Sequence, residues 1–309
     1  MRTAWFLTMC VALAGAETLG QERATFSSST DLVVLHVTVR DHRGSLVSGL
    51  TAESFRVLED DVGQELSFFR AQDTPVSVGL LIDSSGSMAQ NRDRVVTAVA
   101  AFAEASHPED EFFALVFNER VQPVVPAERR FTTDPPVLHA ALAAGLRARG
   151  RTALYDAISV ALDELGHSHR ERQVIVVVSD GGDNASTATF AETLRKAQAS
   201  NVVIYAVALV DPLVRDRNPK LLRRFADATG GRFFEPPGVA RVDAALRDVS
   251  LDIRSGYTLA YVPRNPRRDG TLRRIRVDVV APHGRRLVAS TRMGYIAASE
   301  RQPPAAVIP

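Results

Sequence analysis

The sequence predicts an α/β fold, a doubly wound and mostly parallel Rossmann-like sheet, with a small β-rich flanking domain. Near-continuous apolar runs recur between residues 76 and 209, as expected of parallel strands that helices cover on both faces. Amphipathic stretches with helical spacing separate these runs. Shorter strand patterns lie before residue 70 and after residue 256, outside this alternation.

The composition excludes several classes of protein. With 45% hydrophobic and 24% charged residues, the chain of 309 residues is expected to be globular rather than disordered. Its 37 basic and 36 acidic side chains nearly balance, which argues against a chain-wide attraction to nucleic acid or to an anionic membrane. We therefore expect no nucleic-acid partner.

The first 16 residues have the pattern of a secretory signal peptide. Arg2 precedes an apolar run from Ala4 to Ala14, and the small residues Ala14, Gly15 and Ala16 follow. The run is too short for a membrane span, and no later stretch approaches the roughly 20 apolar residues that a span needs. We expect an exported protein, periplasmic or extracellular, without a transmembrane span in the mature chain. Because Cys10 is the only cysteine, the mature chain has no disulfide and no thiolate metal site.

The expected elements follow from these patterns in chain order. Residues 31–70 form an N-terminal β segment with strands in LVVLHVTV, SFRVLED and ELSFFRA. The central α/β domain spans residues 76–254, where strand and helix alternate. Its strands are expected at 76–83, 112–118, 173–180 and 202–209, and its helices at 92–106, 153–166, 187–200, 218–229 and 239–254.

The C-terminal part returns to strand patterns. Residues 256–296 contain YTLAYVP, LRRIRVDVV and RRLVASTRMGY, and residues 297–309 have the composition of a loose tail. Two or three strands without a partner sheet are marginal in water. Because the ends of an inserted domain usually lie close together, we expect residues 256–296 to pack with residues 31–70.

Polar oxygen donors follow the apolar residues of the first central strand. In LLIDSSGSM, residues 80 to 88, the chain changes abruptly from Leu80, Leu81 and Ile82 to an aspartate and a cluster of serines. One interpretation is a turn that caps the next helix. The other is a set of ligands for a hard cation. Two further predicted loops at the same edge of the sheet carry compatible ligands, so the candidate donors are Asp83, Ser85, Ser87, Thr152 and Asp180.

With these motifs, residues 76–254 resemble a von Willebrand factor type A (VWA) domain with a metal-ion-dependent adhesion site (MIDAS). The resemblance implies that Ser85, Ser87 and Thr152 ligate the ion, and that Asp83 and Asp180 hold it directly or through water. The flanks, including DLVVLHVTVRDHRGSLVSGL and RMGY, resemble bacterial exported proteins called VWFA-related domain proteins. One departure is Arg151, where relatives usually have glycine, and this residue could alter access to the ion.

The resemblance implies a non-enzymatic binding or adhesion module. The expected cofactor is Mg²⁺, or alternatively Mn²⁺ or Ca²⁺, and the expected partner is a protein that offers a carboxylate to the ion. A competing hypothesis is a metal-assisted hydrolase or phosphatase, because a metal beside Asp83 could polarise a phosphoryl oxygen. A third is an assembly subunit of a cell-envelope complex. Position 85 is a serine where a haloacid-dehalogenase-like phosphatase needs a second aspartate, and no His or Glu is placed as a general acid or base. We therefore expect no enzymatic activity.

Three other features have simpler interpretations. His167 and His169 lie in GHSHRER between a helix and a strand, where a solvated loop is expected rather than a metal site. The arginines between residues 264 and 286 are expected on an exposed strand face, because no aromatic residues that could stack on bases lie among them. Asp183 and Asn184 are expected to shape the third loop through bonds to the backbone.

Overall fold

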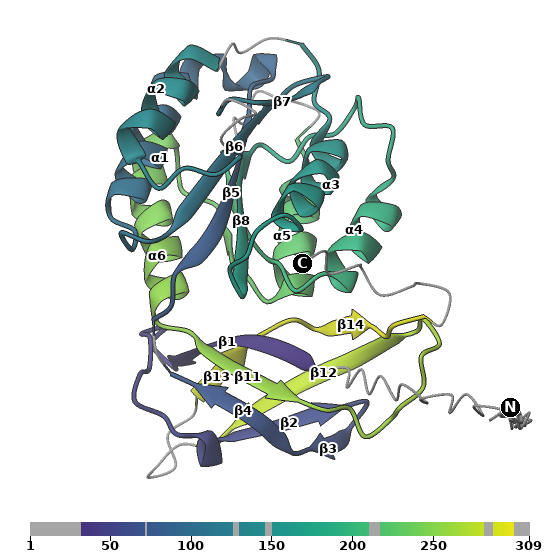
Figure 1. Cartoon of the computed structure of the whole chain (residues 1–309). Helices are drawn as coiled ribbons and strands as arrows, with labels where there is room; N and C mark the ends of the chain where they lie inside the picture. Colours follow the sequence, from purple (N-terminus) through teal and green to yellow (C-terminus); the bar gives the residue numbers. More distant parts are fainter. Residues whose placement is uncertain are drawn as a thin grey trace, which may run out of the picture. The chain divides into compact units, whose positions relative to one another are not determined.

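The computed structural model describes residues 32–71, 73–125, 130–145, 150–209, 217–280 and 287–299 (Figure 1). The predicted signal peptide lies outside these ranges. No helix in the described ranges is long and apolar enough to cross a membrane.

A six-stranded sheet forms the centre of the α/β domain. Its strands are β5 (Val76–Asp83), β6 (Glu111–Phe117), β7 (Val121–Pro123), β8 (Arg172–Ser179), β9 (Val203–Ala208) and β10 (Phe233–Phe234). They lie in the order β10-β9-β8-β5-β6-β7, and every neighbouring pair is parallel except β6 and β7. The chain passes from β5 to β6 on one side and later to β8 on the other, so the order switches at β5. Ligands bind beyond the carboxyl ends of strands at such a switch.

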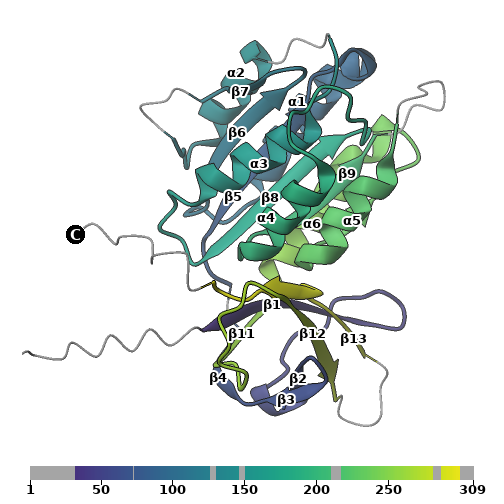
Figure 2. The same cartoon turned by 90° about the vertical axis from the view of Figure 1, so that its right-hand side faces the viewer.

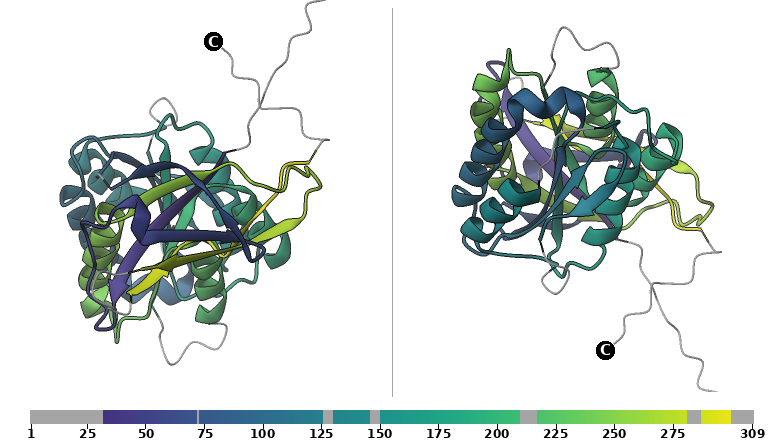
Figure 3. Two further views of the ribbon diagram at one scale, coloured as in Figure 1. Left: turned by 90° about the horizontal axis from the view of Figure 1, so that it is seen from below. Right: turned by 90° about the horizontal axis from the view of Figure 1, so that it is seen from above.

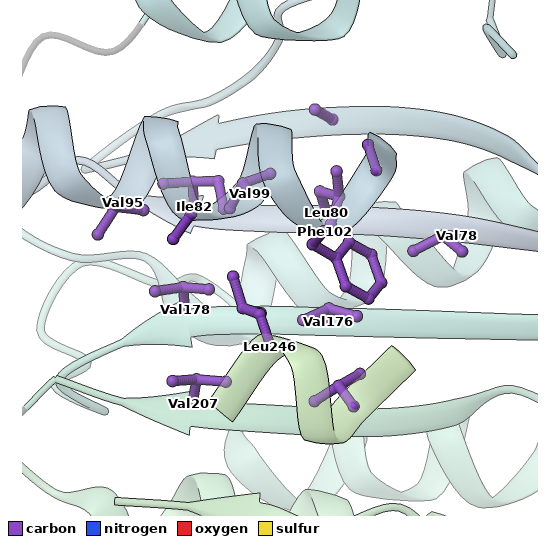
Figure 4. Packing of buried hydrophobic residues seen from close by; sticks show 14 of the residues in the cluster. Val78, Leu80, Ile82, Val95, Val99, Phe102, Val176, Val178, Val207 and Leu246 are labelled. Carbon is purple, nitrogen blue, oxygen red and sulfur yellow. The ribbon is translucent and has the colours of Figure 1, made fainter. Parts of the chain in front are cut away.

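Helices cover both faces of this sheet (Figure 2). One face carries α1 (Arg92–Glu104), α2 (Pro135–Gly145) and α6 (Val242–Arg254), and the other carries α3 (Leu154–Leu165), α4 (Phe190–Ala199) and α5 (Pro219–Thr229). Successive strand residues point to opposite faces. Leu80 and Ile82 of β5 therefore pack with Phe102 of α1 and Leu246 of α6 (Figure 4), whereas Leu81 packs with the helices of the other face. This double coverage explains why the strand sequences are apolar throughout.

The flanking segments form two four-stranded antiparallel sheets (Figure 3). Their strands are β1 (Val33–Asp41), β2 (Phe55–Glu59), β3 (Val62–Gln64), β4 (Leu66–Arg70), β11 (Tyr257–Tyr261), β12 (Leu272–Val279), β13 (Leu287–Ser290) and β14 (Gly294–Ile296). In the first sheet β1 lies between β13 and β11, and in the second β2 lies between β12 and β3. Each sheet thus combines strands from both ends of the chain. The predicted fold class, including the flanking β-rich part, is confirmed.

A buried ionic cluster joins the two flanking segments. Glu59 of β2 is 2% exposed and accepts hydrogen bonds from the hydroxyls of Tyr261 (2.7 Å) and Tyr295 (3.0 Å). The guanidinium of Arg273 lies 3.4 Å from the other Glu59 oxygen. Burial raises the pKa of both tyrosines, which keeps them protonated as donors. The expectation of an exposed strand face is therefore wrong for Arg273, although Arg274 and Arg276 are exposed on β12.

Arginine side chains connect the α/β domain to the flanking sheets. Asp252 of α6 is fully buried and accepts from Arg40 of β1 and from Arg232, which is 3.1 Å away. Arg292, between β13 and β14, donates to the carbonyls of Gln198 (2.5 Å) and Ser200 (2.8 Å) at the end of α4. The buried Asp252 carboxylate and the buried Arg292 guanidinium thus each have partners across the junction.

Three details differ from the expected elements. The helix expected at 187–200 begins only at Phe190, because Thr187 and Ala188 donate their backbone N–H groups to Asp156 of α3 and Thr189 forms a capping box. Helix α2 and the short strands β7 and β10 were not predicted. Residues 297–299, expected in the loose tail, are bonded: Ala297 donates to the Thr271 carbonyl (2.9 Å), and Ser299 bridges to Asp269. Residues 300–309 lie outside the described ranges.

Candidate metal centre

The polar residues after β5 build a compact loop rather than a simple helix cap. Asp83 ends β5 and is fully buried. One of its carboxylate oxygens accepts the backbone N–H of Ser85 (2.8 Å), and the other accepts the hydroxyl of Ser179 (2.6 Å), the last residue of β8. The short 3-10 helix Gly86–Asn91 that follows has no side-chain cap bond. The change from apolar to polar residues therefore places a carboxylate between two neighbouring strand ends.

The first and third loops meet directly through their candidate ligands. The hydroxyls of Ser85 and Ser87 lie 3.0 Å apart. Ser87 also donates its hydroxyl to Asp180 Oδ2 at 2.7 Å. The other oxygen of Asp180 accepts the backbone N–H of Gly182 at 2.9 Å, which fixes the orientation of the carboxylate. Three of the candidate donors thus form one contact chain at the carboxyl ends of β5 and β8.

Thr152, in the second loop, is positioned by both other loops. Its N–H donates to the side-chain oxygen of Asn184 (2.9 Å), and its carbonyl accepts the N–H groups of Asn184 and Ala185 (both 2.9 Å). The turn before it is tied to the first loop, because Gly86 donates its N–H to the Gly150 carbonyl at 3.3 Å. The structure therefore brings the loops of Asp83, Thr152 and Asp180 together at one edge of the sheet.

The side chains of Asp183 and Asn184 accept backbone N–H groups, but those of the second loop rather than those of their own. Asp183 accepts the N–H of Tyr155 (3.3 Å) and the hydroxyl of Ser186 (2.5 Å). Asn184 accepts the Thr152 N–H with its side chain and donates its own backbone N–H to the Thr152 carbonyl. This coupling between loops depends on which strand ends are neighbours, so the sequence alone did not give it.

The electrostatics of the site favour a cation. Burial raises the pKa of Asp83 to about 6, and the nearby negative charge of Asp180 acts in the same direction. Hydrogen bonds from Ser179 and Ser85 offset only part of this effect. A buried carboxylate with only neutral donors is costly unless a positive charge compensates it. A divalent ion beside Asp83 and Asp180 would supply that charge.

The chemistry of the donor set fits a hard divalent ion. Two carboxylates and three hydroxyls offer only oxygen, the ligand type that Mg²⁺, Mn²⁺ and Ca²⁺ share. In the part of the chain that the structure describes, no cluster of three or more His, Cys, Asp or Glu side chains could hold a metal. His167 and His169 are exposed in the loop between α3 and β8.

Two features near the site were missed in the sequence. Ser179 directly precedes Asp180 and donates its hydroxyl to Asp83. Its place beside a candidate ligand is visible in the sequence but was not used to predict this role. Glu119 accepts the N–H of Arg151 at 3.0 Å, and Gly150 has φ +83° with a hypothetical Cβ only 1.8 Å from a Glu119 oxygen. A side chain at position 150 would therefore push Glu119 away from the turn that leads to Thr152. The Arg151 side chain itself is exposed.

Comparisons with known proteins bear on the family and the fold. The family model of the von Willebrand factor type A domain matches residues 77–245. A solved von Willebrand factor type A protein from Catenulispora acidiphila superposes with a TM-score of 0.52 at 15% identity, covering 89% of this chain and 76% of its own.

A second similar structure is proximal thread matrix protein 1 from the mussel byssus, with a TM-score of 0.51 at 14% identity over 63% of this chain and 51% of its own. Another structure of that protein, described with a zinc-occupied MIDAS motif, gives 0.50 at 14% identity over 63% and 49%. At these identities the similarity shows the fold. No curated protein matches the sequence.

Proposed function

Because this chain belongs to the von Willebrand factor type A domain family, whose members are generally non-catalytic interaction modules, we propose that it is an exported binding module. It captures a protein partner through a divalent cation held by Asp83, Ser85, Ser87, Thr152 and Asp180. The observation that supports this most directly is the contact chain Ser85–Ser87–Asp180, with distances of 3.0 and 2.7 Å, beside the buried Asp83.

The ligand set explains why a partner binds. Only two of the five donors carry a charge, and each of these two carboxylates also accepts hydrogen bonds from the protein. A bound divalent ion would therefore keep an open coordination position for one more anionic oxygen. A partner's Asp or Glu side chain supplies such an oxygen. Mg²⁺ is the proposed ion, with Mn²⁺ and Ca²⁺ as alternatives, and the zinc-occupied MIDAS of the mussel protein supports a divalent site.

A hydrolytic role has less support from the residues at this edge. Most mechanisms of metal-assisted phosphate ester hydrolysis need a general acid or base. None of the seven histidines lies in the three loops, and position 85 is a serine. Ser87 and Ser179 donate to Asp180 and Asp83, and these two carboxylates are the ones proposed to hold the ion rather than to act as bases.

Export is part of the proposal and has its own test. It rests on Arg2, the apolar run to Ala14 and the small residues up to Ala16. N-terminal sequencing of the protein from its native host should give a mature chain that begins after Ala16. A cytosolic form that still begins at Met1 would contradict export, while leaving the metal site untouched.

Calorimetric titration of Mg²⁺ and Mn²⁺ tests the site itself. Wild type should bind one ion, Asp83→Ala should bind none, and Thr152→Ala should bind it more weakly. His167→Ala serves as the control, because this exposed residue lies in the loop before β8 and should leave ion affinity unchanged. Equal ion affinity in wild type and Asp83→Ala would remove these residues from the site.

Capture of a partner is tested with native cell envelope. The wild-type protein should retain a partner in Mg²⁺ and release it in chelator, and Asp83→Ala should retain none in either condition. Because the apolar strands do not depend on the ion, circular dichroism should be nearly the same with and without chelator. Retention that survives chelator would refute the cation-dependent mechanism.

A further inference from the structure

A polar cavity lies beside the proposed ion site, on the β6 side of β5. Its volume is about 460 Å³, within the roughly 300 to 1,000 Å³ that is typical of ligand pockets. Its lining includes Ser84, which follows Asp83 directly, the polar residues Asn118, Glu119, Arg120 and Gln122, and Gly145. The backbone of Ser84 donates to the Phe117 carbonyl at 2.7 Å, so the cavity begins where β5 and β6 end together.

Two residues that line the cavity also form hydrogen bonds with the loop of Thr152. Asn118 accepts the N–H of Ala153 through its carbonyl at 2.8 Å, and Glu119 accepts the N–H of Arg151 at 3.0 Å. Arg120 is therefore next in sequence to the residue that holds the Arg151 backbone. The two arginines belong to one corner of the molecule, adjacent to the candidate ligand Thr152.

The guanidinium groups of Arg120 and Arg151 have no partner among the described residues. Their side chains are exposed, and no hydrogen bond or ion pair within the described residues engages either guanidinium. Some exposed arginines of the chain are paired instead. Arg247 pairs with Asp243 at 3.2 Å, and Arg276 pairs with Asp278 at 3.4 Å. Glu119, which also lines the cavity, accepts the Arg151 N–H.

We propose that this cavity is an anion-binding subsite for a second carboxylate of the same partner, so that the captured segment is an acidic peptide with two carboxylates close together. This inference rests on the proposed function, in which the first carboxylate reaches the ion. The exposed guanidinium of Arg120, which lines the cavity beside the proposed ion, can donate charge-assisted hydrogen bonds to such an anion. The amides of Asn118 and Gln122 supply further hydrogen-bond donors to the same anion.

The test uses two synthetic eight-residue peptides of Gly, Ser and Asp. One carries a single Asp, and the other carries two Asp separated by two residues. With saturating Mg²⁺, the two-Asp peptide should bind wild type about three- to tenfold more tightly, since partly exposed charge-assisted hydrogen bonds contribute modestly. Arg120→Gln should reduce that ratio to near one while leaving the affinity for the single-Asp peptide nearly unchanged.

Arg56→Gln is the matched control, because Arg56 is an exposed arginine on β2 that also lacks a partner in the described ranges, and it makes the same change in net charge. It should keep the full ratio. Thermal unfolding and Mg²⁺ titration of each variant establish that the fold and the ion site are intact.

Each outcome separates the subsite from the proposed function. Equal binding of the two peptides by wild type, or an equal loss of the ratio in Arg56→Gln, would overturn the subsite. Mg²⁺-dependent binding of the single-Asp peptide would then still support the proposed function, and its absence would count against both. Tighter, Arg120-dependent binding of a sulfated glycan fragment than of the two-Asp peptide would assign the cavity to a glycan and would overturn the acidic peptide.

Discussion

Replacing Asp83 by asparagine should stabilise the ion-free protein and abolish its response to Mg²⁺. Burial raises the pKa of Asp83 from 3.8 to about 6. A difference of that size corresponds to about 3 kcal/mol, by which the ionised carboxylate destabilises the ion-free fold at neutral pH. Asparagine keeps the shape and one acceptor oxygen for the Ser85 N–H but carries no charge. We expect a gain of about 1 to 3 kcal/mol, because Ser179 must reorient its hydroxyl.

The pH dependence of this effect has a definite sign. A raised pKa means that the folded protein binds the proton more tightly than the unfolded chain does. The stabilising contribution of the protonated Asp83 is therefore fully present below pH 3.8 and is lost as the pH rises through about 6. In chelator, the stability advantage of Asp83→Asn over wild type should be small near pH 4 and largest above about pH 7.

Urea unfolding in chelator and in Mg²⁺ measures both parts of this prediction. At an ion concentration of about 100 times Kd, wild type should gain about 2.7 kcal/mol, and Asp83→Asn should gain nothing. Asp93→Asn is the control, because Asp93 lies at the start of α1 with its side chain 93% exposed, and it should behave as wild type. The reasoning is refuted if Asp83→Asn is less stable than wild type in chelator at pH 7, or if Mg²⁺ stabilises both equally.

Three further predictions concern the flanking sheets. Glu59→Ala should lower the free energy of unfolding by about 2 to 4 kcal/mol, because it removes the buried acceptor shared by Tyr261, Tyr295 and Arg273 and leaves Arg273 only the carboxylate of Asp269 to pair with. It should leave Mg²⁺ affinity unchanged in calorimetry. Gly230→Ala should destabilise by about 1 to 3 kcal/mol in urea unfolding, since φ is +86° and a Cβ would lie 2.4 Å from the Arg292 nitrogen. Removing residues 256–309 should raise hydrogen exchange throughout β1, and unchanged exchange would show that the flanks are independent.

The central strands could be predicted closely because their signal is local. Double coverage by helices requires apolar residues on both faces, so the runs containing β5 and β8 are recognisable without any partner. Helix α2 gave no such signal. Its sequence PPVLHAALAAG has small apolar residues all round, and only Leu138 and Leu142 are buried. The three residues before α4 were misassigned because their bonds to Asp156 come from a distant helix.

In the candidate site, too, the local features could be predicted and the long-range contacts could not. Asp83, Ser85 and Ser87 lie within five residues, so their spacing is legible in the sequence. The roles of Ser179, Asn184 and Glu119 depend on the neighbours that the sheet order gives them. Arg273 was expected to be exposed, because its own strand pattern could not reveal that its guanidinium reaches the buried Glu59 of the other flank. Long-range pairing, rather than propensity, accounts for these misses.

The two ends of the central sheet carry different groups of contacts. The candidate ligands lie at the carboxyl ends of β5 and β8, whereas the bonds to α6 and the flanks gather at the amino ends. Asp110, just before β6, accepts the Val76 N–H at 2.9 Å and pairs with Arg254 of α6 at 2.5 Å. Arg172, the first residue of β8, donates to the Ile253 carbonyl at the end of the same helix. A variant of the flanking sheets that loses partner capture must therefore do so by unfolding the chain, with ion affinity preserved in the molecules that remain folded.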